Sequence, residues 1–137
     1  MGLYNFKDRF VGPILSGDKT HTIRAIRAHP DKPGDTLHLY TGLRTKKAKL
    51  LLRVPCVKIE DIEIRHRVEE FANPDTGYLE HVEWDVIKID DQELYADERE
   101  QFARRDGFRN FAEMMKFWTT PKNRLPFHGN VIHWRRQ

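Results

Sequence analysis

The sequence predicts an α+β domain built around a mixed, barrel-like β-sheet with peripheral helices. A short helical pattern near the N-terminus is followed by several strand-like segments, two adjacent helical patterns and a last strand-like segment. Strands and helices therefore do not alternate regularly, as they would in a doubly wound fold. The length of 137 residues and the 39% hydrophobic content are typical of a single domain, spanning residues 1–137.

The first half of the chain is expected to hold one helix and three strands. Apolar residues with helical spacing around Ile14 are followed by Gly17, which stands where a left-handed residue closes a helix. Strands are expected over 19–24 and 36–40, and the segment between them has the Pro and Gly content of a turn. The apolar run over 48–59 predicts a strand buried on both faces, with Pro55 at a bulge or an edge.

The second half of the chain begins with a polar segment, residues 66–81, which is expected to be a loop insertion with its turn at 73–77. Residues 82–89 alternate as a strand does, and the two aspartates after them can turn the chain. A helix is expected from Asp97, with Glu100 completing its cap, and Gly107 is expected to end it.

A second helix is expected to start at Asn110, which has Glu113 three residues later, and Pro121 blocks its continuation. Its apolar residues lie on one helical face at Phe111, Met114, Met115 and Trp118. Residues 127–134 have the pattern of a last strand.

Charge is distributed unevenly along the chain. Residues 1–54 carry a net charge of +7, residues 55–101 of −10 and residues 102–137 of +6, although the total is only +3. If the two basic segments fold next to each other, they form a positive face that attracts a phosphate-rich partner. The alternative is that the charges simply cover the surface of a soluble domain.

The composition argues against several classes of protein. No segment is apolar enough to span a bilayer and no signal peptide is expected, so no membrane partner is expected. Cys56 is the only cysteine and is expected to be buried, which indicates a reducing compartment, most simply the cytoplasm. The seven histidines form no metal-binding motif and no phosphate-binding glycine loop occurs, so neither a metal nor a cofactor is expected.

One segment resembles the signature of a known family. Gly17 is followed two residues later by Lys19, and then by Thr22 and Arg24; this spacing is similar to the motif of ASCH domains. Further similarities, in family order, are the Pro33-Gly34-Asp35 turn, the Asp106-Gly107-Phe108 break and Phe127-x-Gly129 with Trp134. The resemblance covers most of the chain except residues 66–81. It implies a single PUA-like mixed β-barrel with a cleft lined by the Lys-Thr-Arg segment.

The resemblance implies several functions, between which the fold alone does not choose. Members were proposed to bind RNA, and some small members are amidohydrolases that remove the acyl group from N4-acetylcytidine with a lysine, a threonine and a carboxylate. At least one member is reported to cleave RNA. The expected function is therefore binding of RNA or a modified nucleoside with hydrolysis of the N4-acylcytidine type. The alternatives are ribonuclease action on single-stranded RNA and non-catalytic binding of RNA or DNA.

The catalytic residues that the resemblance implies are Lys19, Thr22 and Asp106. A lysine near a buried pocket, opposed by Arg24 and Arg27, loses its proton more readily, and its neutral amine is a base or a nucleophile. Thr22 is a nucleophile or a hydrogen-bond donor. Because Lys19 and Thr22 have opposite parity in a regular strand, Lys19 must lie in the turn after the first helix or beside a bulge.

The carboxylate is assigned by its order in the chain, so Asp106 is the first candidate and Glu98, Glu100 and Glu113 follow. The residues expected to contact nucleic acid are Arg24, Arg27, Tyr40, Arg44, Lys46, Lys47 and Arg105. Arginine can hold a phosphate with two hydrogen bonds, and a tyrosine can stack on a base. The alternative for Tyr40 is a place in the core.

Overall fold

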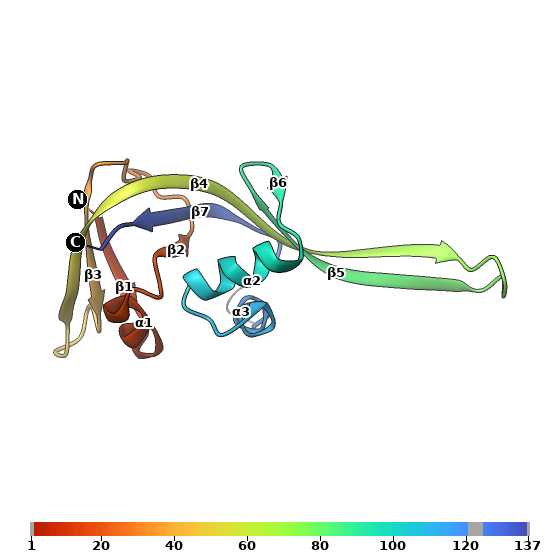
Figure 1. The fold of residues 1–137 in the computed structure, drawn as a ribbon, viewed down its shortest axis with the longest axis horizontal. Helices are drawn as coiled ribbons and strands as arrows, with labels where there is room; N and C mark the ends of the chain where they lie inside the picture. Colours follow the sequence, from red (N-terminus) through yellow and green to blue (C-terminus); the bar gives the residue numbers. More distant parts are fainter. Residues whose placement is uncertain (1, 121–124, 137) are drawn as a thin grey trace.

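The structure is a computed structural model, and it describes residues 2–120 and 125–136. Within these residues the elements are β1 (Gly2–Phe6), a 3-10 turn (Asp8–Phe10), α1 (Val11–Ser16), β2 (His21–Arg24), β3 (Thr36–Thr41), β4 (Lys49–Ala72), β5 (Leu79–Ile89), β6 (Gln92–Glu93), α2 (Ala96–Arg105), α3 (Phe111–Trp118) and β7 (Phe127–Trp134). One mixed sheet contains all of these strands, and the helices pack beside it (Figure 1). The α+β class and the mixed sheet are therefore confirmed.

The long strand β4 is the spine of the sheet and changes partners along its length. Its first part pairs with β3, which pairs in parallel with β1. Its middle part, residues 56–64, pairs with β7, and β7 pairs on its other edge with β2. Its last part, residues 62–72, pairs with β5. The register shift between Cys56 and Lys58, directly after Pro55, confirms the expected bulge in this region.

The sheet does not close into a barrel, so that part of the expected fold is wrong. Along the path β1-β3-β4-β7-β2 the end strands are β1 and β2, and closure would need backbone pairing between them. In the described residues β1 pairs only with β3 and β2 only with β7. Arginine side chains bridge this gap instead. Arg24 Nη2 donates to the Asn5 carbonyl at 2.7 Å and Arg27 Nη2 to the Leu3 carbonyl at 3.0 Å.

The helical caps follow the expected pattern in α3 but not in α2. Asn110 Oδ1 accepts a hydrogen bond from the Glu113 amide at 2.8 Å, as expected for the cap of α3. The cap of α2 is Tyr95, two residues before the expected Asp97, and Glu98 reaches back to the Tyr95 amide. Glu100 instead accepts from the Phe111 amide at 3.0 Å, because it faces the start of α3. Pro121 lies outside the described residues.

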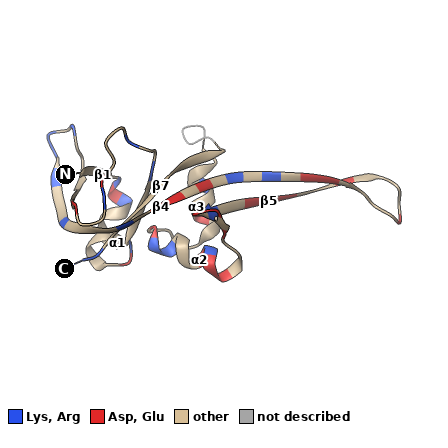
Figure 2. Ribbon diagram, turned by 90° about the horizontal axis from the view of Figure 1, so that it is seen from above, with Lys and Arg blue, Asp and Glu red and all other residues tan. Residues whose placement is uncertain are grey.

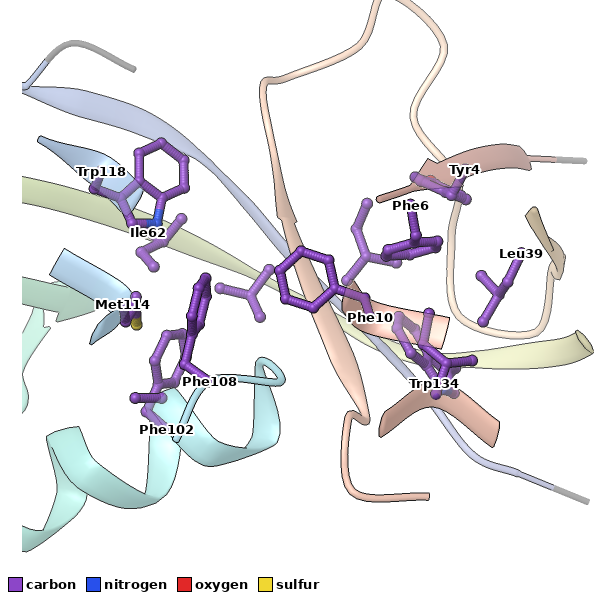
Figure 3. Packing of buried hydrophobic residues seen from close by; sticks show 14 of the residues in the cluster. Tyr4, Phe6, Phe10, Leu39, Ile62, Phe102, Phe108, Met114, Trp118 and Trp134 are labelled. Atoms are coloured by element: carbon purple, nitrogen blue, oxygen red, sulfur yellow. The ribbon is translucent and has the colours of Figure 1, made fainter. Parts of the chain in front are cut away.

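The core is rich in aromatic side chains and lies between the sheet and the helices (Figure 3). Phe10 lies between a group around Phe6 and Trp134 and a second group around Phe108 and Trp118 (Figure 3). The expected apolar face of α3 is confirmed, since Met114, Met115 and Trp118 are buried. Trp134 and Cys56 are buried as well. No helix in the described part of the chain combines the length and the apolar character needed to cross a membrane.

Residues 66–81 do not form the expected loop. The chain from Ile62 to Ala72 pairs in continuous antiparallel register with Leu79–Ile89, and only residues 73–78 between them turn. This two-stranded ribbon projects from the body (Figure 1). Its outer part, residues 66–85, is called the arm below. The many acidic residues of the arm and its Asn73-Pro74 turn give it the composition of a loop.

Two other element boundaries differ from the expected ones. The strand β1 is absent from the expected elements, although Gly2, Tyr4 and Phe6 alternate with exposed residues in the burial pattern of a half-buried strand. The expected strand over 19–24 begins only at His21. Lys19 and Thr20 belong to the connection after α1, which ends at Gly17 with φ of +90°.

Candidate functional site

A pocket of about 410 Å³ opens where β1, β2 and the break between α2 and α3 meet. Its polar lining includes Lys19, Thr22, Arg24 and Asp106. Its remaining wall is mostly aromatic and includes Phe6, Phe10, Phe108, Phe117, Trp118 and Phe127. The three residues expected to be catalytic and one of the expected nucleic-acid contacts thus line the same pocket.

The backbone around Lys19 explains why its side chain shares a pocket with Thr22. Lys19 N donates to the Pro13 carbonyl at 3.0 Å, and Thr20 N donates to the Arg105 carbonyl at 2.8 Å. These bonds hold the turn after α1 against the end of α2, so β2 starts only after Thr20. Lys19 therefore lies in the turn after Gly17, and the strand parity that would separate it from Thr22 does not apply.

Lys19 and Asp106 form a buried pair. The exposed fraction is 2% for Lys19 and 5% for Asp106. Lys19 Nζ donates to Asp106 Oδ1 at 3.1 Å and to the Asp106 carbonyl at 2.5 Å. The amine also lies 4.7 Å from the ring centre of Phe10, which favours a cation at this point. Asp106 is therefore the carboxylate that the structure places beside Lys19, ahead of the other three candidates.

Asp106 is held in place by the end of α2. It is the C-cap residue, its amide donates to the Phe102 carbonyl, and Gly107 follows with φ of +97°. A Cβ atom on Gly107 would lie 2.9 Å from Phe10 Cδ1 and 3.0 Å from Lys19 Cδ. Glycine is required here twice, by the left-handed backbone and by the close approach of the Lys19 stem.

Burial sets the direction of both pKa values in this pair. Burial lowers the pKa of Lys19 below its ordinary value, and the negative charge of Asp106 opposes this shift. Burial raises the pKa of Asp106, and Lys19 opposes that shift in turn. Arg24 lowers the pKa of Lys19 as expected, but the other arginine that does so is Arg9 rather than Arg27. Proton transfer from Lys19 to Asp106 is thereby made easier than in water.

Arg24 connects Thr22 to the edge of β1. Its Nε atom donates to Thr22 Oγ1 at 3.1 Å, and its guanidinium lies 4.8 Å from the ring centre of Phe6. With its oxygen accepting this bond, the Thr22 hydroxyl is left to donate its own proton to another acceptor.

His21 is a buried polar residue for which the sequence analysis assigned no role. It is only 1% exposed, and neither ring nitrogen makes a hydrogen bond within the described residues. Its Nε2 atom lies 3.5 Å from Asp106 Oδ1, and its ring packs on Phe102 and His133. Burial and the neighbouring Lys19 hold the pKa of His21 well below its ordinary value, so the imidazole is neutral. The sequence feature that could have indicated a role for His21 is its position between Lys19 and Arg24, within the motif segment.

The remaining residues expected to bind nucleic acid do not line this pocket. Arg27 lies over the Tyr4 ring at 4.0 Å. Tyr40 is half-buried in β3, opposite Asn5 of β1. The exposed residues of the loop between β3 and β4 include Arg44, Lys46 and Lys47.

Arg105 lies in a neighbouring groove of about 790 Å³, called the arginine groove below. The groove is lined by the arginines Arg9, Arg104, Arg105 and Arg109, together with Asp18 and Glu113 among others. Glu113 pairs with both Arg9 and Arg109. Within residues 2–120 and 125–136, no cluster of three or more metal-ligand side chains is present.

No family model matches the chain, and neither the curated proteins nor the solved structures contain a significant match. Fold and site together define the chain as a mixed α+β protein with an aromatic pocket around a buried lysine–carboxylate pair.

Proposed function

We propose that this chain is an amidohydrolase that removes the acyl group from an N4-acylated cytidine, free or in RNA. The observation that carries the proposal is the buried Lys19–Asp106 pair at the wall of an aromatic pocket of about 410 Å³. Aromatic walls suit a planar base, and an amine beside a carboxyl group provides a site for proton transfer. The motifs that resemble ASCH domains support the same proposal. We include in the proposal that the fold is related to that of PUA-like domains.

The proposed reaction adds water to the acyl carbon and breaks its bond to N4, giving cytidine and a carboxylic acid. Neutral Lys19 takes a proton from the attacking water, and the new C–O bond forms. The Thr22 hydroxyl, oriented by Arg24, donates a hydrogen bond to the acyl oxygen as that oxygen becomes negative. The proton held between Lys19 and Asp106 then passes to the departing N4 amine.

Thr22 is assigned as a donor rather than as the nucleophile for a geometric reason. Its oxygen already accepts a hydrogen bond from Arg24, which draws electron density away from the lone pair that would attack. Among the described residues, the hydrogen bonds of Lys19 Nζ go to Asp106, and none links it to the Thr22 hydroxyl. Water is therefore the better candidate for the attacking oxygen.

The pocket also favours amide hydrolysis over the alternatives. Ribonuclease action or simple RNA binding needs an open basic groove that follows a phosphate chain. Here Lys19 and Asp106 are buried among phenylalanines, whereas the basic surfaces, which are the arginine groove and the loop with Arg44, Lys46 and Lys47, lie outside the pocket. These exposed cations can bind the phosphates of an RNA that contains the modified base.

The test is to incubate the protein with N4-acetylcytidine and with a structured RNA, and to identify the products by mass spectrometry. Lys19→Met keeps the volume of the side chain but removes the amine, and Lys32→Met is the matched control at an exposed lysine. We expect deacylated cytidine from the wild type and the control, and a loss of about 100-fold or more with Lys19→Met. Shortened RNA without deacylation would support the ribonuclease alternative. No product from either substrate would refute a hydrolase of these two kinds.

A further inference from the structure

The arm, residues 66–85, has more exposed apolar side chains than a free surface needs. The exposed large hydrophobic residues in this segment are Val68, Phe71, Tyr78, Leu79 and Val82. They are five of the ten that the described chain exposes, in a segment of only 20 residues. Tyr78 and Leu79, beside the turn, are 76% and 74% exposed. The register of the ribbon places Val68 and Leu79 on one face of the arm and Phe71 and Val82 on the other, so each face carries exposed apolar side chains that a partner can cover.

The arm lacks the packing that normally stabilises a hairpin. The two strands pair with each other throughout, but β7 reaches β4 only as far as Ile64 and β6 reaches β5 only as far as Lys88. Both outer edges of the arm are therefore without a neighbouring strand among the described residues. A two-stranded ribbon is marginally stable in water when nothing covers either face. An additional surface against the arm would remove this weakness.

The charge of the arm limits what that surface can be. Residues 66–85 contain one arginine and six acidic residues, a net charge of −5 with neutral histidines. The acidic residues are Glu69, Glu70, Asp75, Glu80, Glu83 and Asp85 (Figure 2). Nucleic acid is repelled by such a segment. Edge-to-edge pairing of two arms is opposed as well, because it places like charges side by side.

The body of the same chain carries the opposite charge. Residues 1–54 have a net charge of +7 and residues 102–137 of +6. The arginine groove is the basic surface of the body with a concave shape, and Arg104, Arg105 and Arg109 are exposed there. Pro13 and the largely buried Phe108 add apolar atoms to the lining of this groove. The arm and the groove, two parts of one chain, thus carry opposite charges.

We propose that the chain forms a two-fold symmetric dimer in which the arm of each protomer docks in the arginine groove of its partner. An exchange of identical contacts satisfies both arms and both grooves at once, and it closes the assembly at two copies. The apolar residues of the arm provide the buried area, while the acidic residues select the basic groove and orient the approach. This inference does not depend on the proposed reaction.

The test is the molar mass in solution, measured by light scattering or sedimentation equilibrium across a range of protein concentrations. We expect a dimer for the wild type, and a weakening of at least tenfold in the dimer dissociation constant for Tyr78→Ser/Leu79→Ser. The matched control is Ile26→Ser, which removes an exposed apolar side chain outside the arm and leaves the dimer intact. A monomeric wild type at 100 μM or an unchanged dimer in the arm variant overturns the proposal.

A charge-exchange experiment tests the groove. Arg104→Glu/Arg109→Glu is expected to weaken the dimer at low salt, and so is Glu69→Lys/Glu70→Lys. Equal mixing of these two proteins is expected to restore a dimer, because one arm and one groove are again complementary in charge. Circular dichroism verifies that each variant is folded. Failure of the groove variant to weaken the dimer, or of the mixture to restore it, overturns the assignment of the groove.

Discussion

The chemistry of this chain depends on a few buried polar residues, of which Lys19 and Asp106 are the centre. Each is stabilised by the other and destabilised by burial, so small changes of charge alter the protonation of both. Arg24 and His21 are polar neighbours of the pair, and Asp106 is the carboxylate of this cluster. The proton that the proposed reaction must move is therefore held at one place.

The pH dependence of the proposed reaction should report Lys19. The rate needs the neutral amine, so it rises with pH, and the midpoint lies below the pKa of an ordinary lysine because burial lowers the pKa of Lys19. Asp106→Asn removes the negative charge that raises this pKa, so the midpoint should move to lower pH and the maximum rate should fall. The exposed Asp97→Asn is the control, and kcat/KM against pH is the measurement. A midpoint that moves to higher pH contradicts the role given to Lys19.

Gly107 is the residue at which backbone and pocket depend on each other. Gly107→Ala should cost about 1–2 kcal/mol for its left-handed backbone and roughly 1–3 kcal/mol more for contacts with Phe10 and Lys19. Gly34→Ala is the matched control, since its φ is +96° and nothing lies within 4 Å of the added Cβ. Urea unfolding of both variants separates the two costs. Equal losses would show that the Lys19 stem adapts without strain.

At the scale of single elements, sequence patterns predict a helix correctly where its cap and its apolar face depend only on residues near in the chain. The apolar spacing and the Asn110 cap define α3 without help from distant residues. The same reasoning predicts the wrong start for α2. Asp97 and Glu100 have the three-residue spacing of a capping pair, but both lie inside the helix. Whether Tyr95 or Asp97 caps the helix depends on the position at which the chain leaves the preceding hairpin of β5 and β6.

The two caps allow a direct comparison. Asn110→Ala should lower the free energy of unfolding by about 1 kcal/mol, because the Glu113 amide loses its acceptor. Asp97→Ala should cost only about 0.3 kcal/mol, since Asp97 contributes a favourable charge to the first turn and no capping bond. Chemical denaturation with a common slope measures both. A larger loss at Asp97 than at Asn110 would place the cap of α2 at the residue first expected.

For the whole molecule, stability should depend on a histidine buried where α2, β2 and β7 meet. His21 has a folded pKa well below the value of about 6.5 for a free histidine. Below that pH the unfolded chain binds a proton that the folded chain does not, so the free energy of unfolding falls as the pH falls.

His21→Leu should reduce this slope by as much as about 1.4 kcal/mol per pH unit. The exposed His29→Leu should leave the slope unchanged, with thermal or urea unfolding between pH 4 and 7 as the measurement. Equal slopes in all three proteins would show that His21 becomes protonated without unfolding the chain.

The amino-acid sequence by itself determined the parts of this protein that depend on neighbours along the chain. Helix α1 ends at a left-handed Gly17, the strands β3 and β7 lie where their patterns predict them, and the face of α3 is the one that its spacing indicates. It also placed Lys19, Thr22 and Asp106 in one proposed site, through motif resemblance rather than geometry.

Only the tertiary structure decided which distant residues meet. Lys19 and Asp106 are separated by 87 positions, and no periodicity encodes their contact. The gap between β1 and β2 is spanned by the side chains of Arg24 and Arg27 and not by backbone pairing. The arm has the composition of a loop because acidic residues and an Asn-Pro-Asp turn are equally typical of loops, and only the pairing of β4 with β5 identifies it as a ribbon. Long-range pairing is a property of the whole packed chain, so it cannot be read from local sequence patterns.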